Sequence, residues 1–309
     1  MRKLLVVTIL AAALAAPSPA RAQATFKASV EVVPISVVVH DQHGRMITTL
    51  GAADFEVIDG GERRPILQFR VDDQSPITLA VLVDVSGSMR VSSKIAMARD
   101  VVRALAGDLR DGRDEVALFT FDSALHEQYA FTTHPAALGA SLAEVDPFGV
   151  TSLYDAIAET AREIGDRPAP RRAILVLTDG LDNSSRLSPP EVSALASSID
   201  VPVYVVATVP HIDQQSWLDR AALRDAQAPG DLQDLSAWTG GALMWATGAL
   251  EAAAAARRVV SELGHQYVLA IDSAAGGDWR PLEVRVRDRR LTVRARSGYF
   301  TRRAAQARP

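Results

Sequence analysis

The chain has 309 residues, a formal net charge of −4, a hydrophobic content of 48% and no cysteine. This length is enough for one large globular domain and a smaller one, held together by their cores rather than by disulfides. The mildly acidic balance argues against a nucleic-acid partner, because phosphate contacts need clustered basic residues.

The first 22 residues have the form of a secretory signal peptide. Arg2 and Lys3 give a positive start, residues 4–16 are apolar, and residues 20–22 have the small-x-small form of a cleavage site. The alternative is a membrane anchor, but this apolar run is too short to span a bilayer, and no later segment has the ~20 apolar residues required. We therefore expect an exported protein, periplasmic or secreted, without a transmembrane anchor after cleavage of residues 1–22.

Residues 23–75 carry the alternating pattern of antiparallel strands. Ile35 and Val37 share one face, and the polar segments at residues 41–44 and 59–61 are typical of hairpin turns. The pattern predicts a small N-terminal β region.

Residues 76–263 alternate between strands and helices, which predicts a mostly parallel sheet with helices on both faces. The expected strands lie at 77–83, 115–121, 125–131, 173–178, 203–208 and 241–246. The expected helices lie at 94–109, 215–226, 231–238 and 249–263, with two more that begin near 152 and 189. Ser152 and Asp155 have the spacing of a capping box at the start of one helix.

Residues 264–302 return to a period of two, which predicts half-buried antiparallel strands around a turn at 288–290. Neither flank alone has enough strands for a stable sheet, so we expect both flanks to form one β-sandwich-like domain, with residues 76–263 inserted between them. Residues 303–309 form a polar tail. A cluster of six arginines in this region predicts a solvated sheet face: Arg285, Arg287, Arg289, Arg290, Arg294 and Arg296.

Polar side chains follow the buried run at residues 77–83. Asp84, Ser86 and Ser88 alternate there, so a carboxylate and two hydroxyls converge at the carboxyl end of an expected parallel strand. Ligands bind at this end of the strands in open α/β sheets. Hard oxygen ligands with few charges suit Mg²⁺, which keeps waters and a free position for a partner's oxygen. The two serines also suit the N-cap of the next helix.

Two further segments end at the same expected edge of the sheet. Thr151 lies in a glycine-containing loop that enters a helix, and Asp179 follows a second buried strand. Taken alone, Asp179 and the glycine after it are an ordinary turn signal. Asp122, Asp182 and Asn183 are expected on the same rim, where turn chemistry is their more ordinary role.

Together these segments resemble the von Willebrand factor type A domain and its metal-ion-dependent adhesion site, with the pattern Asp-x-Ser-x-Ser, then Thr, then Asp. The resemblance implies a doubly wound, Rossmann-like α/β fold with a six-stranded, mostly parallel sheet, and a bound Mg²⁺ or Mn²⁺. The implied metal ligands are Asp84, Ser86, Ser88, Thr151 and Asp179. One departure is Val150, since a second glycine often precedes the threonine in the family.

The resemblance extends to the flanking segments. The valine-rich N-terminal strands, residues 54–60 and residues 293–299 are similar to exported bacterial proteins described as von Willebrand factor type A-related, which are abundant in Acidobacteria. This narrower similarity covers nearly the whole chain after the signal peptide. It implies an architecture more than a function.

An enzyme is not expected. The six histidines show no metal-ligand spacing, Ser86 and Ser88 have no evident base, and no Gly-x-Ser-x-Gly elbow, Walker A motif or dinucleotide fingerprint occurs. Two functions remain open. The first is an exported adhesion module that captures an exposed Asp or Glu of a protein partner through Mg²⁺. The second is a structural or assembly factor whose metal site holds a sibling subunit or stabilises the fold. An exposed apolar rim around the site would favour the first.

Overall fold

The computed structural model of the chain describes residues 32–91, 93–180, 182–208, 232–272 and 278–301. The expected signal peptide at 1–22, the helix expected at 215–226 and the polar tail at 303–309 lie outside the described residues. Among the residues that are described, no helix is both long and apolar enough to span a membrane.

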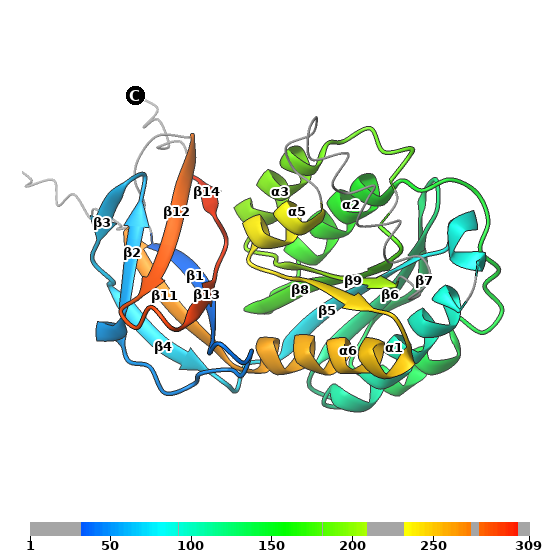
Figure 1. Cartoon of the computed structure of the whole chain (residues 1–309), viewed down its shortest axis with the longest axis horizontal. Helices are drawn as coiled ribbons and strands as arrows, with labels where there is room; N and C mark the ends of the chain where they lie inside the picture. The colour runs from blue at the N-terminus through cyan, green and yellow to red at the C-terminus, as the bar shows by residue number, and fades with distance from the viewer. Residues whose placement is uncertain (1–31, 92, 181, 209–231, 273–277, 302–309) are drawn as a thin grey trace, which may run out of the picture. The chain divides into compact units, whose positions relative to one another are not determined.

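The centre of the fold is a six-stranded sheet in the order β10-β9-β8-β5-β6-β7. Figure 1 shows helices on both sides of this sheet. Its strands are β5 (Ile77–Asp84), β6 (Glu115–Phe121), β7 (Leu125–Thr132), β8 (Arg171–Thr178), β9 (Val203–Thr208) and β10 (Leu243–Ala246). All neighbours run parallel except β7, which pairs antiparallel with β6. Every residue of β5 is buried, as its continuous apolar run requires of a strand covered on both faces. The expected α/β fold class is confirmed.

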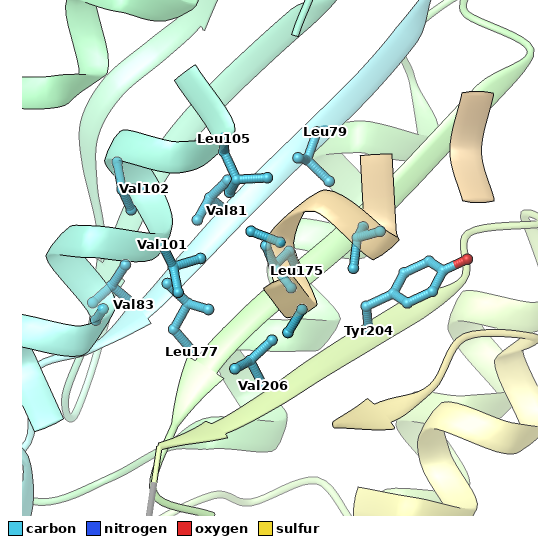
Figure 2. Packing of buried hydrophobic residues seen from close by; sticks show 14 of the residues in the cluster. Leu79, Val81, Val83, Val101, Val102, Leu105, Leu175, Leu177, Tyr204 and Val206 are labelled. Carbon is cyan, nitrogen blue, oxygen red and sulfur yellow. The ribbon is translucent and has the colours of Figure 1, made fainter. Parts of the chain in front are cut away.

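Helices cover both faces of this sheet. On one face lie α1 (Lys94–Asp108) and α6 (Ala249–Gly264), and on the other lie α2 (Leu153–Gly165), α3 (Pro189–Ser198) and α5 (Leu232–Thr239). Figure 2 shows Leu79 and Val83 of β5 in one cluster with Val101 of α1. Ala80 and Leu82 point the other way, into the core under α2, α3 and α5. The side chains of β5 alternate between the two faces of the sheet, so this one strand packs against both helix layers.

The flanking segments form two four-stranded sheets, β13-β1-β11-β4 and β14-β12-β2-β3. Their strands are β1 (Val32–His40), β2 (Phe55–Asp59), β3 (Glu62–Arg64), β4 (Gln68–Asp72), β11 (Gln266–Asp272), β12 (Trp279–Val286), β13 (Thr292–Arg294) and β14 (Gly298–Phe300). Because β1 pairs antiparallel with β11 and β2 with β12, each sheet contains strands from both flanks. Ile35, Val57 and Leu269 share one core between the sheets. The expected antiparallel β domain built from both flanks is confirmed, and we call it the β part.

Glycines form the two expected hairpin turns of the β part. Gly44 lies at φ 74°, and Gly60 and Gly61 lie at φ 59° and 86°. These left-handed conformations are costly for residues with a Cβ, so both turns depend on glycine. The described part of the chain also contains three short 3-10 helices: η1 (Ala52–Asp54), η2 (Gly87–Arg90) and η3 (Pro135–Ala140).

A buried carboxylate on α6 connects the β part to the central α/β part, which we define as β5 to α6. Glu262 accepts hydrogen bonds from Arg258 of the same helix, at 2.8 Å, and from Arg294 of β13. His40 Nε2 of β1 lies 3.0 Å from its Oε1. Although burial opposes the charge, these basic neighbours hold the pKa of Glu262 at about 2. Glu262 is therefore a charged centre shared by both parts of the chain.

The expected solvated arginine face is wrong for two of its six residues. Arg294 pairs with Glu262, and the buried Arg296 donates to the Ser197 carbonyl at 2.7 Å and lies 3.5 Å from Asp200. Strand periodicity shows which side chains share a face, but not that another part of the chain covers that face. Arg285, in contrast, pairs with its neighbour Glu283 on the exposed surface.

Candidate metal site

Asp84 is the last residue of β5, and its side chain is fully buried at 0% exposure. Its Oδ1 accepts a hydrogen bond from the Ser86 amide at 2.9 Å, and its Oδ2 accepts one from the Thr178 hydroxyl at 2.6 Å. Thr178 ends β8, the parallel neighbour of β5, so the two strand ends are joined directly. This contact fixes the orientation of the Asp84 carboxylate.

The hydroxyls of Ser86 and Ser88 converge beside this carboxylate. Ser86 is the N-cap of η2, yet its side chain makes no capping hydrogen bond. Instead its Oγ lies 3.1 Å from Oγ of Ser88. Ser86 is buried, whereas Ser88 is partly exposed. The serine oxygens are thus available to each other and to a shared ligand rather than committed to the helix end.

The loop that carries Thr151 is bound to the loop after β5. The Phe148 amide donates to the Val85 carbonyl at 2.7 Å, and the Gly87 amide donates to the Gly149 carbonyl at 3.1 Å. Gly149 has φ +91°, a conformation that favours glycine. Thr151 itself is buried. The structure therefore places Thr151 in the segment that adjoins Ser86 and Ser88.

Asp182 and Asn183 hold this loop in place. Asn183 Oδ1 accepts from the Thr151 amide, and Asp182 Oδ1 accepts from the Leu153 amide, both at 2.9 Å. Their side-chain oxygens thus satisfy backbone donors at the start of α2. Asp122, the third rim residue, accepts from the Ala124 amide at 3.0 Å in a turn, and its carbonyl accepts from the Ser152 amide.

The capping box expected at the start of α2 is wrong. The Ser152 side chain makes no capping hydrogen bond. Asp155 accepts instead from the amides of Arg186 and Leu187, at 3.1 and 2.9 Å. The cap of α2 comes from a loop distant in sequence, which local spacing does not reveal.

Asp179 follows β8 and forms an ion pair that spacing in the sequence does not predict. The ammonium group of Lys94 lies 2.9 Å from Asp179 Oδ2 and donates to the Ser88 carbonyl at 3.3 Å. Both Lys94 and Asp179 are buried. One feature of the sequence does distinguish Lys94: the chain has thirty arginines but only three lysines, Lys3, Lys27 and Lys94.

The electrostatics of the site favour a cation. Burial raises the pKa of Asp84 to about 6, although hydrogen bonds from Ser86 and Thr178 oppose the rise, and the nearby charge of Asp179 adds to it. A divalent ion beside these two carboxylates would favour their charged forms. The desolvated Asp84 therefore fits a role as a partner of a cation.

The donor set also fits a hard divalent ion. Two carboxylates and three hydroxyls are oxygen donors of the kind that Mg²⁺ and Mn²⁺ prefer. Within the described ranges, no three His, Cys, Asp or Glu side chains gather into a metal-binding group. A metal at this edge would therefore depend on the hydroxyls of Ser86, Ser88 and Thr151 as well as on Asp84 and Asp179.

Exposed apolar side chains lie beside these polar residues. Val91 follows η2 and is 57% exposed, and Phe148 and Val150 on the Thr151 loop are 77% and 45% exposed. We call these three residues the apolar rim. A large exposed aromatic side chain next to a buried polar site is typical of an interaction surface.

Residues 79–181 match the von Willebrand factor type A domain family. This range contains all five expected metal ligands. No curated protein matches the chain.

Solved structures similar to the chain include several bacterial proteins. A von Willebrand factor type A protein from Catenulispora acidiphila is 12% identical, with a TM-score of 0.49, over 77% of this chain and 74% of that chain. The conserved hypothetical protein BatB from Bacteroides thetaiotaomicron is 16% identical, with a TM-score of 0.46, over 60% and 98%. The PilB minor pilin from Streptococcus sanguinis is 16% identical, with a TM-score of 0.44, over 65% and 63%.

Proposed function

The chain is a von Willebrand factor type A domain protein, and on this premise we propose that it is a binding module rather than an enzyme. Domains of this family commonly mediate protein–protein interaction. The proposed module captures an Asp or Glu side chain of a protein partner through Mg²⁺ or Mn²⁺ held at the loop edge of the central sheet. The signal-like residues 1–22 support an exported location, periplasmic or secreted.

The apolar rim is the observation that carries this proposal. A site that only stabilised the fold would need no apolar side chains in solvent beside it. Phe148, at 77% exposure, would instead be buried on the apolar neighbours of a captured acidic residue. The combination of a polar centre and an apolar border supports a protein partner over a free anion.

The residues of the site would share the task of holding the ion. The hydroxyls of Ser86, Ser88 and Thr151 would be direct ligands, and Asp84 and Asp179 would lie close by or act through water. A divalent ion bound there supplies an electrophilic centre, because two carboxylates and neutral hydroxyls leave it attracted to a further anionic oxygen. Asp182 and Asn183 would keep the Thr151 hydroxyl in position through the backbone.

Selection from a random peptide library tests the proposal without a known partner. The full chain is immobilised, peptides are bound in Mg²⁺, and retained peptides are released with a chelator. We expect the released peptides to share an Asp or Glu, and we expect replacement of that residue by Asn or Gln to abolish binding. If peptides bind equally with and without chelator, the metal-dependent function is wrong and a structural role for the site takes its place.

Phe148→Ala is expected to weaken capture of a selected acidic peptide about ten-fold, because the peptide then loses apolar contact area worth one large side chain. Uptake of Mn²⁺ should not change, since Phe148 offers no side-chain oxygen. Fluorescence polarisation of the labelled peptide measures the first effect, and calorimetry measures the second.

Leu67→Ala is the matched control for this prediction. Leu67 is also an exposed apolar residue, but it lies between β3 and β4 of the β part. Peptide affinity should stay at the wild-type value in this variant. Equal losses in both variants would show that the apolar rim is not the peptide contact.

A further inference from the structure

Lys94 is a buried cation placed at the proposed metal site. Its ammonium group lies 2.9 Å from Asp179 Oδ2 and 3.3 Å from the Ser88 carbonyl oxygen, so it contacts two of the residues assigned to the metal. The side chain of Lys94 is 10% exposed and that of Asp179 is 3% exposed. Removal of such a charge from water is costly, so favourable contacts must compensate for the burial of Lys94.

Stabilisation of α1 does not explain why Lys94 is buried. Lys94 is the first residue of α1, where the helix dipole disfavours positive charge. The first turn of α1 contains no acidic residue that would compensate. The charge of Lys94 therefore interacts unfavourably with the dipole of α1. Its favourable contacts are those at the proposed metal site.

The choice of lysine over arginine also points to the site. Thirty of the 33 basic residues are arginine, and Lys94 is the last of the three lysines in the chain. Arginine presents a planar fork, whereas lysine presents a compact, strongly hydrated point charge on a flexible stem. A compact charge resembles a small metal cation and can leave a carboxylate by rotation of the stem.

We propose that Lys94 is a resident cation that competes with the divalent metal for Asp179. This inference rests on the proposed metal site and deepens it. Without metal, Lys94 neutralises one of the two carboxylates, so Asp84, Asp179 and Lys94 together have a charge of −1. Uptake of a divalent ion requires the ammonium group to leave Asp179, and the free energy of the broken ion pair is subtracted from the affinity for the metal. The resident lysine thus keeps affinity for metal alone weak.

Calorimetric titration with Mn²⁺ tests the competition. Lys94→Met keeps an unbranched stem of nearly the same length and removes the charged end group, and it should bind Mn²⁺ at least ten-fold more tightly than the wild type. Arg90→Met is the matched control. Arg90 is an exposed basic residue of η2 that pairs with Asp146 rather than with a site carboxylate. Its removal should change Mn²⁺ affinity less than two-fold, because exposed charges are screened.

Lysine reactivity gives a second measurement on the unaltered protein. Reductive dimethylation followed by mass spectrometry reports how fast each lysine is modified. Lys94 should react slowly without metal and several-fold faster in saturating Mn²⁺, while Lys27 in the same sample serves as the internal reference. Equal or slower modification of Lys94 in Mn²⁺ would overturn the competition.

The outcomes separate this inference from the proposed function. If the wild type and Lys94→Met take up Mn²⁺ with equal affinity, the competition is wrong and the metal site stands. If neither protein takes up Mn²⁺, the metal site itself is wrong and the inference falls with it. Uptake by Lys94→Met alone supports the inference in its strongest form, because the lysine then excludes the metal from the wild type.

Discussion

Asp84→Ala is expected to abolish Mn²⁺ uptake and metal-dependent capture of acidic peptides. The substitution removes one of the two carboxylates at the proposed site, and the remaining ligands would hold a divalent ion too weakly to compete with water. Calorimetry of metal uptake and peptide binding with and without chelator measure the loss. Unchanged capture by Asp84→Ala would contradict the adhesion function.

Because Asp84 is buried, its replacement by alanine also affects stability, so further variants are needed. Alanine leaves the Thr178 hydroxyl and the Ser86 amide without their acceptor, at a cost of about 1–3 kcal/mol for each donor. Asp84→Asn keeps the shape and an acceptor oxygen, so it should retain the fold while it still loses the metal. Thr151→Ala should weaken metal uptake less than either variant, because water can replace one neutral ligand.

Glu262→Gln is expected to lower the free energy of unfolding by about 3–5 kcal/mol at pH 7, the usual cost of removing one partner of a buried ion pair. Arg294 and His40 would then face a neutral amide in a buried setting. Urea denaturation measures the change. Glu283→Gln is the control, because Glu283 pairs with Arg285 on the exposed surface and should change stability by less than about 1 kcal/mol.

The effect of Glu262 should depend on pH. Its pKa in the folded protein is about 2, below the ordinary value of 4.5, so its contribution to stability is fully present above pH 4.5. As the pH falls from 4.5 towards 2, about 3 kcal/mol of that contribution is lost. The wild type and Glu262→Gln should therefore converge in stability at low pH. A constant difference between pH 7 and pH 3 would show that the charge of Glu262 is not its source.

Periodic patterns in the sequence predict most of the fold. The run at residues 77–83 and the alternation around Ile35 and Leu282 reveal strands because burial on two faces, or on one, leaves a direct trace in the order of apolar residues. The turns at Gly44 and Gly60 are visible for a different reason, because their backbone conformation restricts the residue type.

Contacts between segments distant in sequence are what the patterns do not predict. The sequence predicts that Asp182 and Asn183 lie on the rim of the site. It does not predict that their side chains bind the backbone of Thr151 and of the start of α2, because these contacts depend on the fold. Arg296 has the same strand periodicity as Arg285, yet one is buried and the other exposed. Lys94 pairs with a carboxylate 85 positions away. Each of these contacts is set by packing rather than by spacing.

The pairing of β4 with β11 has a consequence for how the chain folds. Asp72 and Gln266 are partners in this ladder, although the whole α/β part separates them in sequence. Closing so long a loop from an unfolded chain is entropically costly and slow. Once the α/β part has folded, however, its two ends are already close together. Strand β1 is synthesised early, and we therefore expect it to remain unpaired until its partners β11 and β13 have been made. The middle of the chain would fold first, and the two flanks would join last.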